Sequence, residues 1–199
     1  MAERGYQKMR YKGKLYQIGD WVCLKDGVAA NNERKLVGKL LKILPMYGNS
    51  EYPEWPTVEV QWYYFGSELD LQSMGIKSGD MIYIGDNEVF LSDHTDIVFV
   101  ESIINKCEVL SIQEYDQRQI TDERTFYCRS KFLTLDNKLD PPFEDWATLC
   151  SCNKPMNPNL LTVGCDKWGK WFHPYCQGLD TEEAQKLEYF ECTLWRDSN

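Results

Sequence analysis

The last quarter of this 199-residue chain holds five of its eight cysteines and one of its two histidines. Zinc takes four sulfur or nitrogen ligands in a tetrahedron, and two ligands a few residues apart can hold it from one turn. The spacing therefore predicts one Zn²⁺ site of the Cys3His type, whose binding energy stabilises a segment too small to fold alone. The alternative is chance clustering of thiols. The predicted ligands are Cys150, Cys152, His173 and Cys176.

The redox state expected for these thiols depends on the compartment of the protein, for which the sequence gives two indications. The chain has no run of about 18 apolar residues, which predicts no transmembrane helix. Its first residues, MAERGYQKMRYKGKLY, are charged and lack the apolar core of a signal peptide. We therefore expect a reduced, intracellular protein in which cysteines are thiols or metal ligands rather than disulfides.

The net charge of −9 argues against binding to nucleic acid, because no dominant basic patch offsets it. An acidic surface instead suits a basic partner. Plain solubility explains the same charge equally well.

A linker separates the cysteine-rich segment from the part before it. The stretch DNKLDPPFED, residues 136–145, combines a Pro-Pro pair with four acidic residues. We expect a first domain over residues 15–135, a linker over 136–147 and a small domain over 148–199. In the small domain, Thr181 is expected to cap a C-terminal helix over EEAQKLEYF.

The first domain reads as a series of short strands. Hydrophobic residues alternate with polar ones or form short apolar runs, as in a barrel or sandwich. The predicted fold class is therefore mainly β, followed by a zinc-stabilised finger. The expected strands are 20–25, 36–44, 57–64, 80–84, 97–103, 108–111 and 125–129.

The order Cys-x-Cys, Cys, Trp-Phe-His-Pro-x-Cys, helix, Cys resembles the PHD finger. That family binds two zinc ions, and the resemblance assigns the second to Cys165, Cys192 and the residues three positions after each. Those positions are Trp168 and Trp195, and an indole cannot ligate zinc. We expect this second site to be lost, with the two indoles filling its space. A weaker site completed by Asp166 is the alternative.

The resemblance also bears on what the finger can read. PHD fingers that bind trimethyl-lysine enclose it in aromatic rings. One such wall is present as Trp171, whereas Leu149, Met156 and Thr162 stand at the other positions. We therefore expect weak or no methyl-lysine binding by the finger.

The first domain resembles the BAH domain, and together with the finger it resembles the plant-type BAH–PHD histone readers. The resemblance implies a β-rich fold that binds nucleosomes, histone tails or other proteins. It is carried by Gly19-Asp20 and by the stretches LVGKLLKI, VEVQWYYF, EVFLSDHTD, INKCEVLS and TFYCR, in this order.

In the methyl-reading members, the WYY segment supplies walls of an aromatic cage, which here implies Trp62 and Tyr64. Alternation places both on one face of the strand. The third wall of those readers falls on Leu36, so Trp21, Tyr11 or Tyr16 is needed to complete a cage. The alternative has both rings packed in the core. The resemblance places His94 and Asp96 beside the cage, in contact with the peptide.

Three functions follow from these patterns. The first is a nuclear reader of a methylated lysine, by analogy the trimethylated histone H3 tail, acting through the BAH domain. The second is a scaffold subunit of a chromatin-modifying complex that reads no mark. The third, an enzyme such as a zinc hydrolase or ubiquitin ligase, is disfavoured because a closed Cys3His site leaves no open coordination position and the chain has no nucleophile motif or phosphate-binding loop.

Overall fold

Apolar residues at every second position build a strongly curled sheet in the first part of the chain. The structure is a computed structural model that describes residues 5–25, 35–44, 56–118 and 122–197. It divides into two compact units, the first over residues 1–70 and 87–140 and the second over 71–86 and 141–199. Among the described helices, none is long and apolar enough to cross a membrane.

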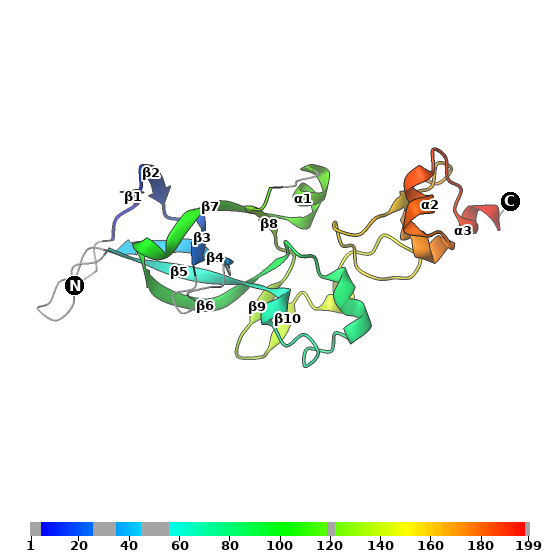
Figure 1. The fold of residues 1–199 in the computed structure, drawn as a ribbon. Coiled ribbons are helices and arrows are strands. Elements are labelled where there is room, and N and C mark those ends of the chain that lie inside the picture. Colours follow the sequence, from blue (N-terminus) through cyan, green and yellow to red (C-terminus); the bar gives the residue numbers. More distant parts are fainter. Residues whose placement is uncertain (1–4, 26–34, 45–55, 119–121, 198–199) are drawn as a thin grey trace, which may run out of the picture. The chain divides into compact units, whose positions relative to one another are not determined.

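The sheet of the first unit has eight strands in the order β10-β9-β6-β5-β4-β3-β7-β8. Its long central strands β4, β5 and β6 lie side by side and curl together (Figure 1). The strand bounds are β3 Trp21–Lys25, β4 Lys35–Leu44, β5 Thr57–Phe65, β6 Val89–Phe99, β7 Ile103–Leu110, β8 Thr125–Tyr127, β9 Lys131–Leu133 and β10 Lys138–Asp140.

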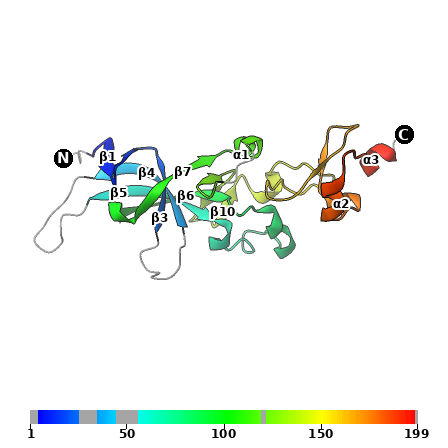
Figure 2. The same cartoon turned by 45° about the horizontal axis from the view of Figure 1, so that its top comes forward.

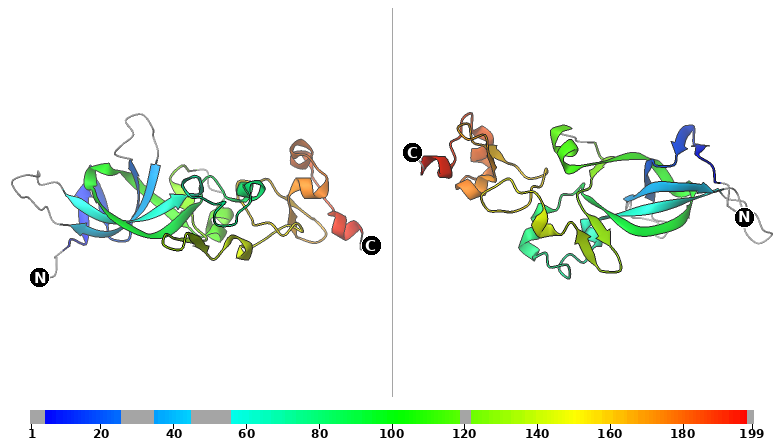
Figure 3. Two further views of the ribbon diagram at one scale, coloured as in Figure 1. Left: turned by 90° about the horizontal axis from the view of Figure 1, so that it is seen from below. Right: turned by 180° about the vertical axis from the view of Figure 1, so that it is seen from behind.

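Smaller elements complete this unit. Strands β1 (Lys8–Tyr11) and β2 (Lys14–Gln17) form an antiparallel hairpin. Helix α1 (Ile112–Arg118) follows β7, and two 3₁₀ turns, η1 (Gly66–Glu68) and η3 (Val100–Ser102), follow β5 and β6. Turning the molecule shows how the curl of the strands encloses an interior (Figures 2 and 3).

The sheet has a buried cluster on each of its two faces, because successive residues of a strand point to opposite sides. One cluster includes Val22, Leu24, Val58 and Val60, which project into the curl. A second cluster includes Cys23, Val37, Tyr63, Val89 and Phe126, whose odd-numbered members on β3–β6 point to the other face. β-Bulges after Cys23, Leu40 and Gln61 allow the strong local bending.

The second unit is mostly irregular, as expected for a segment with a small core. It contains a two-stranded sheet, short helices and 3₁₀ turns, and a buried cluster that includes Cys165, Phe172 and Cys192. Its elements are η2 Ser78–Tyr83, η4 Phe143–Asp145, β11 Val163–Gly164, β12 Trp171–Phe172, η5 Pro174–Gln177, α2 Thr181–Lys186 and α3 Thr193–Arg196.

Several local expectations differ from the structure. The strand predicted over 97–103 is the end of β6, the 3₁₀ turn η3 and the first residue of β7, and the helix expected over EEAQKLEYF ends at Lys186. The strand predicted over 80–84 is the 3₁₀ helix η2, since only Tyr83 of it is buried. Helix α2 is capped by Asp180 rather than Thr181, because the Asp180 side chain accepts the N–H of Glu183 in a capping box. The stretch expected as a linker carries β10, which pairs with β9 at the edge of the sheet.

Candidate functional site

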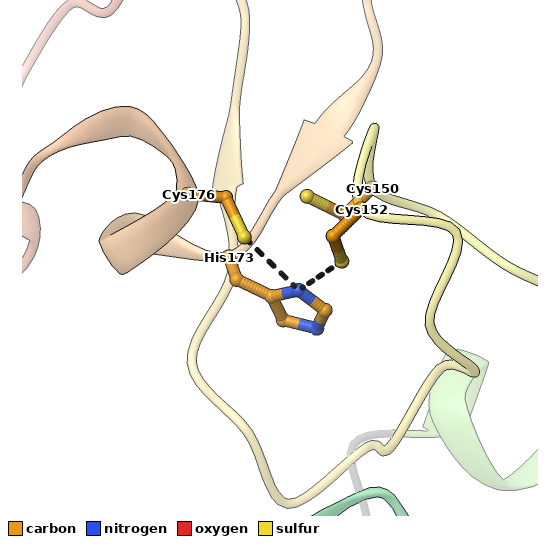
Figure 4. A group of neighbouring side chains, drawn as sticks. All are labelled: Cys150, Cys152, His173 and Cys176. Atoms are coloured by element: carbon orange, nitrogen blue, oxygen red, sulfur yellow. Dashed lines mark hydrogen bonds between the residues drawn. The ribbon is translucent and has the colours of Figure 1, made fainter. Parts of the chain in front are cut away.

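Four side chains of the second unit converge on one point (Figure 4). Their ligand atoms all lie within 4.8 Å of one another. Nδ1 of His173 is 3.5 Å from Sγ of Cys152 and 4.0 Å from Sγ of Cys176. A tetrahedral zinc site has ligand–ligand edges of about 3.5 to 3.8 Å, so this donor set fits Zn²⁺. The group is the predicted one: Cys150, Cys152, His173 and Cys176.

Burial changes the pKa values of these groups in ways that have opposite effects on metal binding. Burial lowers the pKa of His173, which favours the neutral imidazole that a metal requires. Burial and the neighbouring thiol of Cys150 raise the pKa of Cys176 to about 12. The raised pKa makes the Cys176 thiolate unfavourable without a cation. A bound Zn²⁺ offsets this free-energy cost, since cysteines bind metal as thiolates.

A residue far away in sequence packs against the histidine of this cluster. The ring of Tyr83 lies 5.6 Å from the ring of His173, and the Tyr83 side chain is buried. The segment around Tyr83 is tied to the same unit by a Lys154–Asp80 ion pair of 2.6 Å. The amide of Asn157 also donates to the carbonyl of Ile82 at 2.8 Å. The Tyr83 ring therefore lies against the candidate metal centre, and the segment that carries it is held by contacts within the same unit.

Around Cys165 and Cys192, where the sequence predicts the loss of a second zinc site, the described residues form no second cluster of metal ligands. The N–H of Cys192 donates to Sγ of Cys165 at 3.3 Å, and both residues are buried. Trp195 packs against this core as expected. Trp168 does not, because it lies in a turn with its side chain 42% exposed. The Asp166 carboxylate is occupied by the N–H of Phe190 at 2.6 Å.

Of the four positions of the second unit compared above with an aromatic cage, one carries an exposed ring. Trp171 is half exposed on β12 and Leu149 is exposed, whereas Met156 and Thr162 are half-buried. A cavity of about 480 Å³ lies beside Trp171 and Tyr189.

In the first unit, a β-bulge between Gln61 and Tyr63 lies next to three of the other predicted site residues, Trp62, Tyr64 and His94. Pairing of β5 with β6 shifts after Gln61, which leaves the carbonyl of Trp62 and the N–H of His94 outside the ladder. The buried hydroxyl of Ser92 bridges them, donating to the Trp62 carbonyl at 2.9 Å and accepting from the His94 N–H at 3.1 Å. Ser92 therefore fixes the backbone of both residues.

Tyr64 and His94 meet directly. The Tyr64 hydroxyl is 2.7 Å from Nδ1 of His94, and the two rings are nearly parallel with centroids 6.3 Å apart. Burial, with the negative charges of Glu68 and Asp93, raises the pKa of Tyr64, so the phenol stays protonated. This bond orients the Tyr64 ring.

Trp62 and Leu36 share the face of the sheet on which Tyr64 lies. Both are half-buried and pack against the cluster in the curl. Within the described residues no ring contact joins Trp62 to Tyr64, although alternation along β5 gives them one face.

Among the described residues, no ring contact joins Trp62 or Tyr64 to the three aromatic residues expected as a third wall. Trp21 donates from its indole N–H to the Tyr63 hydroxyl at 3.1 Å and packs with the cluster of the opposite face. Tyr16 is buried, and Tyr11 packs against the core.

Asp96 is exposed on β6, opposite Val60. Its carboxylate accepts the N–H of Ile97 at 2.7 Å. Among the described residues, no hydrogen bond joins it to Tyr64 or His94.

One ring that the sequence patterns missed lies against Tyr64. Phe132 of β9 contacts the Tyr64 ring edge-on, with centroids 5.7 Å apart and planes at 84°. The sequence signal for this hairpin is the Asp136-Asn137 pair between the segments KFL and KLD, since Asn tolerates the left-handed backbone that Asn137 adopts, with a φ of 48°.

Fold and sites together define a class of protein. A curled sheet carries aromatic side chains and a histidine on one partly exposed face, and a second unit carries a metal-ligating Cys3His cluster. Such an arrangement suits binding of another molecule.

Comparison with known proteins gives the family. Residues 14–142 match the BAH domain, and the chain belongs to this family. It is 36% identical over 135 residues to the chromatin remodeling protein SHL and 34% identical over 135 residues to the chromatin remodeling protein EBS, both of Arabidopsis thaliana. Each match covers 68% of this chain, and the chain spans about half of those relatives (55% and 54%).

A solved structure supports the fold. The crystal structure of the yeast Rsc2 BAH domain superposes with a TM-score of 0.50 at 14% identity, covering 94% of this chain and 74% of that one. The predicted mainly β, BAH-type fold is confirmed.

Proposed function

We propose that this protein is a non-catalytic nuclear chromatin reader whose BAH domain binds a trimethylated lysine of the histone H3 tail. The observation that carries the proposal is the Tyr64–His94 pair on one partly exposed face of β5 and β6, a face that Trp62 shares by alternation along β5. Membership of the BAH family and likeness to two chromatin remodeling proteins support a chromatin partner.

The chemistry of the site favours a quaternary ammonium. Ring faces attract a cation through their quadrupole, and this attraction is worth about 0.5 to 2 kcal/mol depending on desolvation. Trp62 and Tyr64 provide two such faces. The hydrogen bond to His94 orients the Tyr64 ring before the ligand binds, so less conformational entropy is lost on binding. Trp62 is anchored by its packing against the core, so the site is largely formed before the ligand arrives.

Residues beside these rings suit the rest of a basic peptide. The carboxylates of Asp93 and Asp96 are exposed on β6, and the whole chain carries a net charge of −9. A lysine- and arginine-rich tail gains long-range attraction from such a surface, which raises the association rate. We assign peptide contacts to His94 and Asp96.

The second unit acts, in this proposal, as a degenerate PHD-type finger with one structural zinc ion. Cys150, Cys152, His173 and Cys176 hold the ion, whose coordination by four protein ligands stabilises the fold and leaves no position for substrate. The domain limits that go with this assignment are 15–135 for the BAH domain and 148–199 for the finger. Because Leu149, Met156 and Thr162 provide no ring beside Trp171, methyl-lysine recognition falls to the BAH domain.

A scaffold subunit that reads no mark is the second candidate. The half-exposed side chains of Trp168, Trp171 and Tyr189 in the second unit favour it, since exposed rings are common where proteins bind one another. Here the partner is another subunit of a chromatin complex.

Calorimetric titration of the full chain with H3 tail peptides, trimethylated and unmethylated at one lysine, tests the reader proposal. We expect methyl-dependent binding that Trp62→Ala and Tyr64→Ala abolish, with Tyr6→Ala as a control because Tyr6 is exposed in the same unit. Equal binding of both peptides refutes a reader. Purification of a stable complex unaffected by these variants favours the scaffold.

A further inference from the structure

The aromatic site contains a ring from a strand that the sequence patterns did not include. Phe132 stands nearly perpendicular to Tyr64, with ring centroids 5.7 Å apart. The two rings contact each other edge to face, and the ring surface that this contact leaves open can attract a methylated ammonium group, as the rings of an aromatic cage do. Phe132 is half-buried, so part of its surface is open to a ligand.

The strand register explains how Phe132 reaches this face. β9 runs parallel to β6, with Phe132 opposite Ser92, and β5 runs antiparallel to β6, with Tyr64 opposite Phe90. Residues that face each other across strands share a face of the sheet, and so do residues two apart on one strand. Phe132, Ser92, Phe90 and Tyr64 therefore all lie on one face.

We propose that Phe132 is the third aromatic wall of the methyl-lysine site, in the role that the family resemblance assigns to the position of Leu36. This inference rests on the proposed reader function and adds a residue that determines its specificity. Leu36 has no aromatic ring, so a third aromatic wall has to come from another residue.

A clamp holds the end of β9 where this role needs it. The carboxylate of Asp93 on β6 accepts both the hydroxyl of Thr134 at 2.7 Å and its N–H at 3.1 Å. These two bonds lower the pKa of Asp93, so the clamp is charged at neutral pH. Thr134 is two residues from Phe132, and β9 is also paired on its other side with β10. The backbone that carries the Phe132 ring is therefore held by β6 on one side and by β10 on the other.

The experiment separates the electrostatic role of the ring from its volume. Titrate the full zinc-loaded chain with an H3 tail peptide carrying trimethyl-lysine and with the same peptide carrying its uncharged carbon isostere. Phe132→Leu keeps an apolar side chain but removes the quadrupole. We expect this variant to bind the charged peptide about 2- to 30-fold more weakly, the range of one ring–cation contact, and to bind the isostere nearly as the unmodified chain does.

Leu135→Ala is the matched control. Leu135 follows Thr134 in the same hairpin and is 95% exposed, so its truncation should leave both affinities unchanged. Phe132→Tyr retains an aromatic ring and should keep the preference for the charged peptide that Phe132→Leu loses. Circular dichroism of each variant checks that the sheet is intact.

The outcomes distinguish this inference from the function on which it rests. If the unmodified chain prefers the methylated peptide and Trp62→Ala removes that preference while Phe132→Leu does not, the reader stands and Phe132 is not a wall. If the unmodified chain shows no methyl dependence, both proposals are overturned. Equal losses for the charged peptide and the isostere in Phe132→Leu also overturn the inference, because they show packing rather than attraction to a cation.

Discussion

Removing the charge of Arg129 should destabilise the first unit far more than removing a charge from its surface. Nε and Nη2 of Arg129 donate to the two carboxylate oxygens of Glu88 at 2.6 and 2.8 Å. The side chains are 7% and 0% exposed. Arg129→Met leaves the buried carboxylate without its cation, beside the Tyr127 hydroxyl that donates to it at 3.3 Å. Breaking a buried pair in this way costs about 3–5 kcal/mol, a large part of a typical domain stability.

Guanidinium denaturation of the full chain, followed by the amide NMR resonances of β6, measures this loss for the first unit alone. The internal control is Arg118→Met, since the Arg118–Glu108 pair is 48% exposed on both sides and an exposed pair contributes less than about 1 kcal/mol. Replacing both buried partners, in Glu88→Leu with Arg129→Met, should recover much of the loss because no charge stays buried. The reasoning is refuted if Arg129→Met costs no more than Arg118→Met.

Three further predictions concern the metal centre and the sheet. Elemental analysis should give one zinc ion per chain, and a chelator should abolish the amide dispersion of the second unit while leaving that of the sheet; two ions per chain would contradict the loss of the second site. Tyr83→Ala should destabilise the second unit by about 3 kcal/mol and speed zinc transfer to a chromogenic chelator, because it removes the ring against His173; Tyr175→Ala, with a side chain 81% exposed, should do neither. Gly38→Val should lower the free energy of unfolding of the sheet by about 1–3 kcal/mol in chemical denaturation, since even a Cβ at Gly38 meets Leu24 Cδ1 at 3.2 Å and Val60 Cβ at 3.3 Å; an unchanged midpoint would show that these strands can separate.

The metal cluster and the ring pair on β5 could be predicted because their information is local. Ligands three residues or fewer apart in sequence chelate from one turn, so spacing alone identified Cys150 with Cys152 and His173 with Cys176. Alternation alone gave Trp62 and Tyr64 one face of a strand. The structure agrees with the local geometry in both cases.

Long-range partners could not be predicted in the same way. Phe132 reaches Tyr64 through a parallel pairing of β9 with β6, and nothing in a single sequence specifies which distant strand a short apolar run will join. The acidic, proline-containing stretch after it was typical of a linker, which hid the hairpin. Tyr83 is 90 residues from His173, and the strand predicted around it relied on a short apolar run that a 3₁₀ helix explains equally well.

The chain crosses between its two units three times, at 70/71, 86/87 and 140/141. A finger appended by one linker has a single crossing and can be cut away without consequence for the rest. Here, residues 71–86 lie between β5 and β6 in sequence, the two strands that carry Tyr64 and His94, yet Asp80, Ile82 and Tyr83 have their partners after residue 140. A truncation at residue 140 therefore removes the packing of a segment whose two ends are fixed by the strands of the aromatic site. Loss of zinc acts on the same segment through the ring of Tyr83. Under the proposed zinc assignment, the metal centre thereby contributes to the stability of the segment that connects β5 with β6.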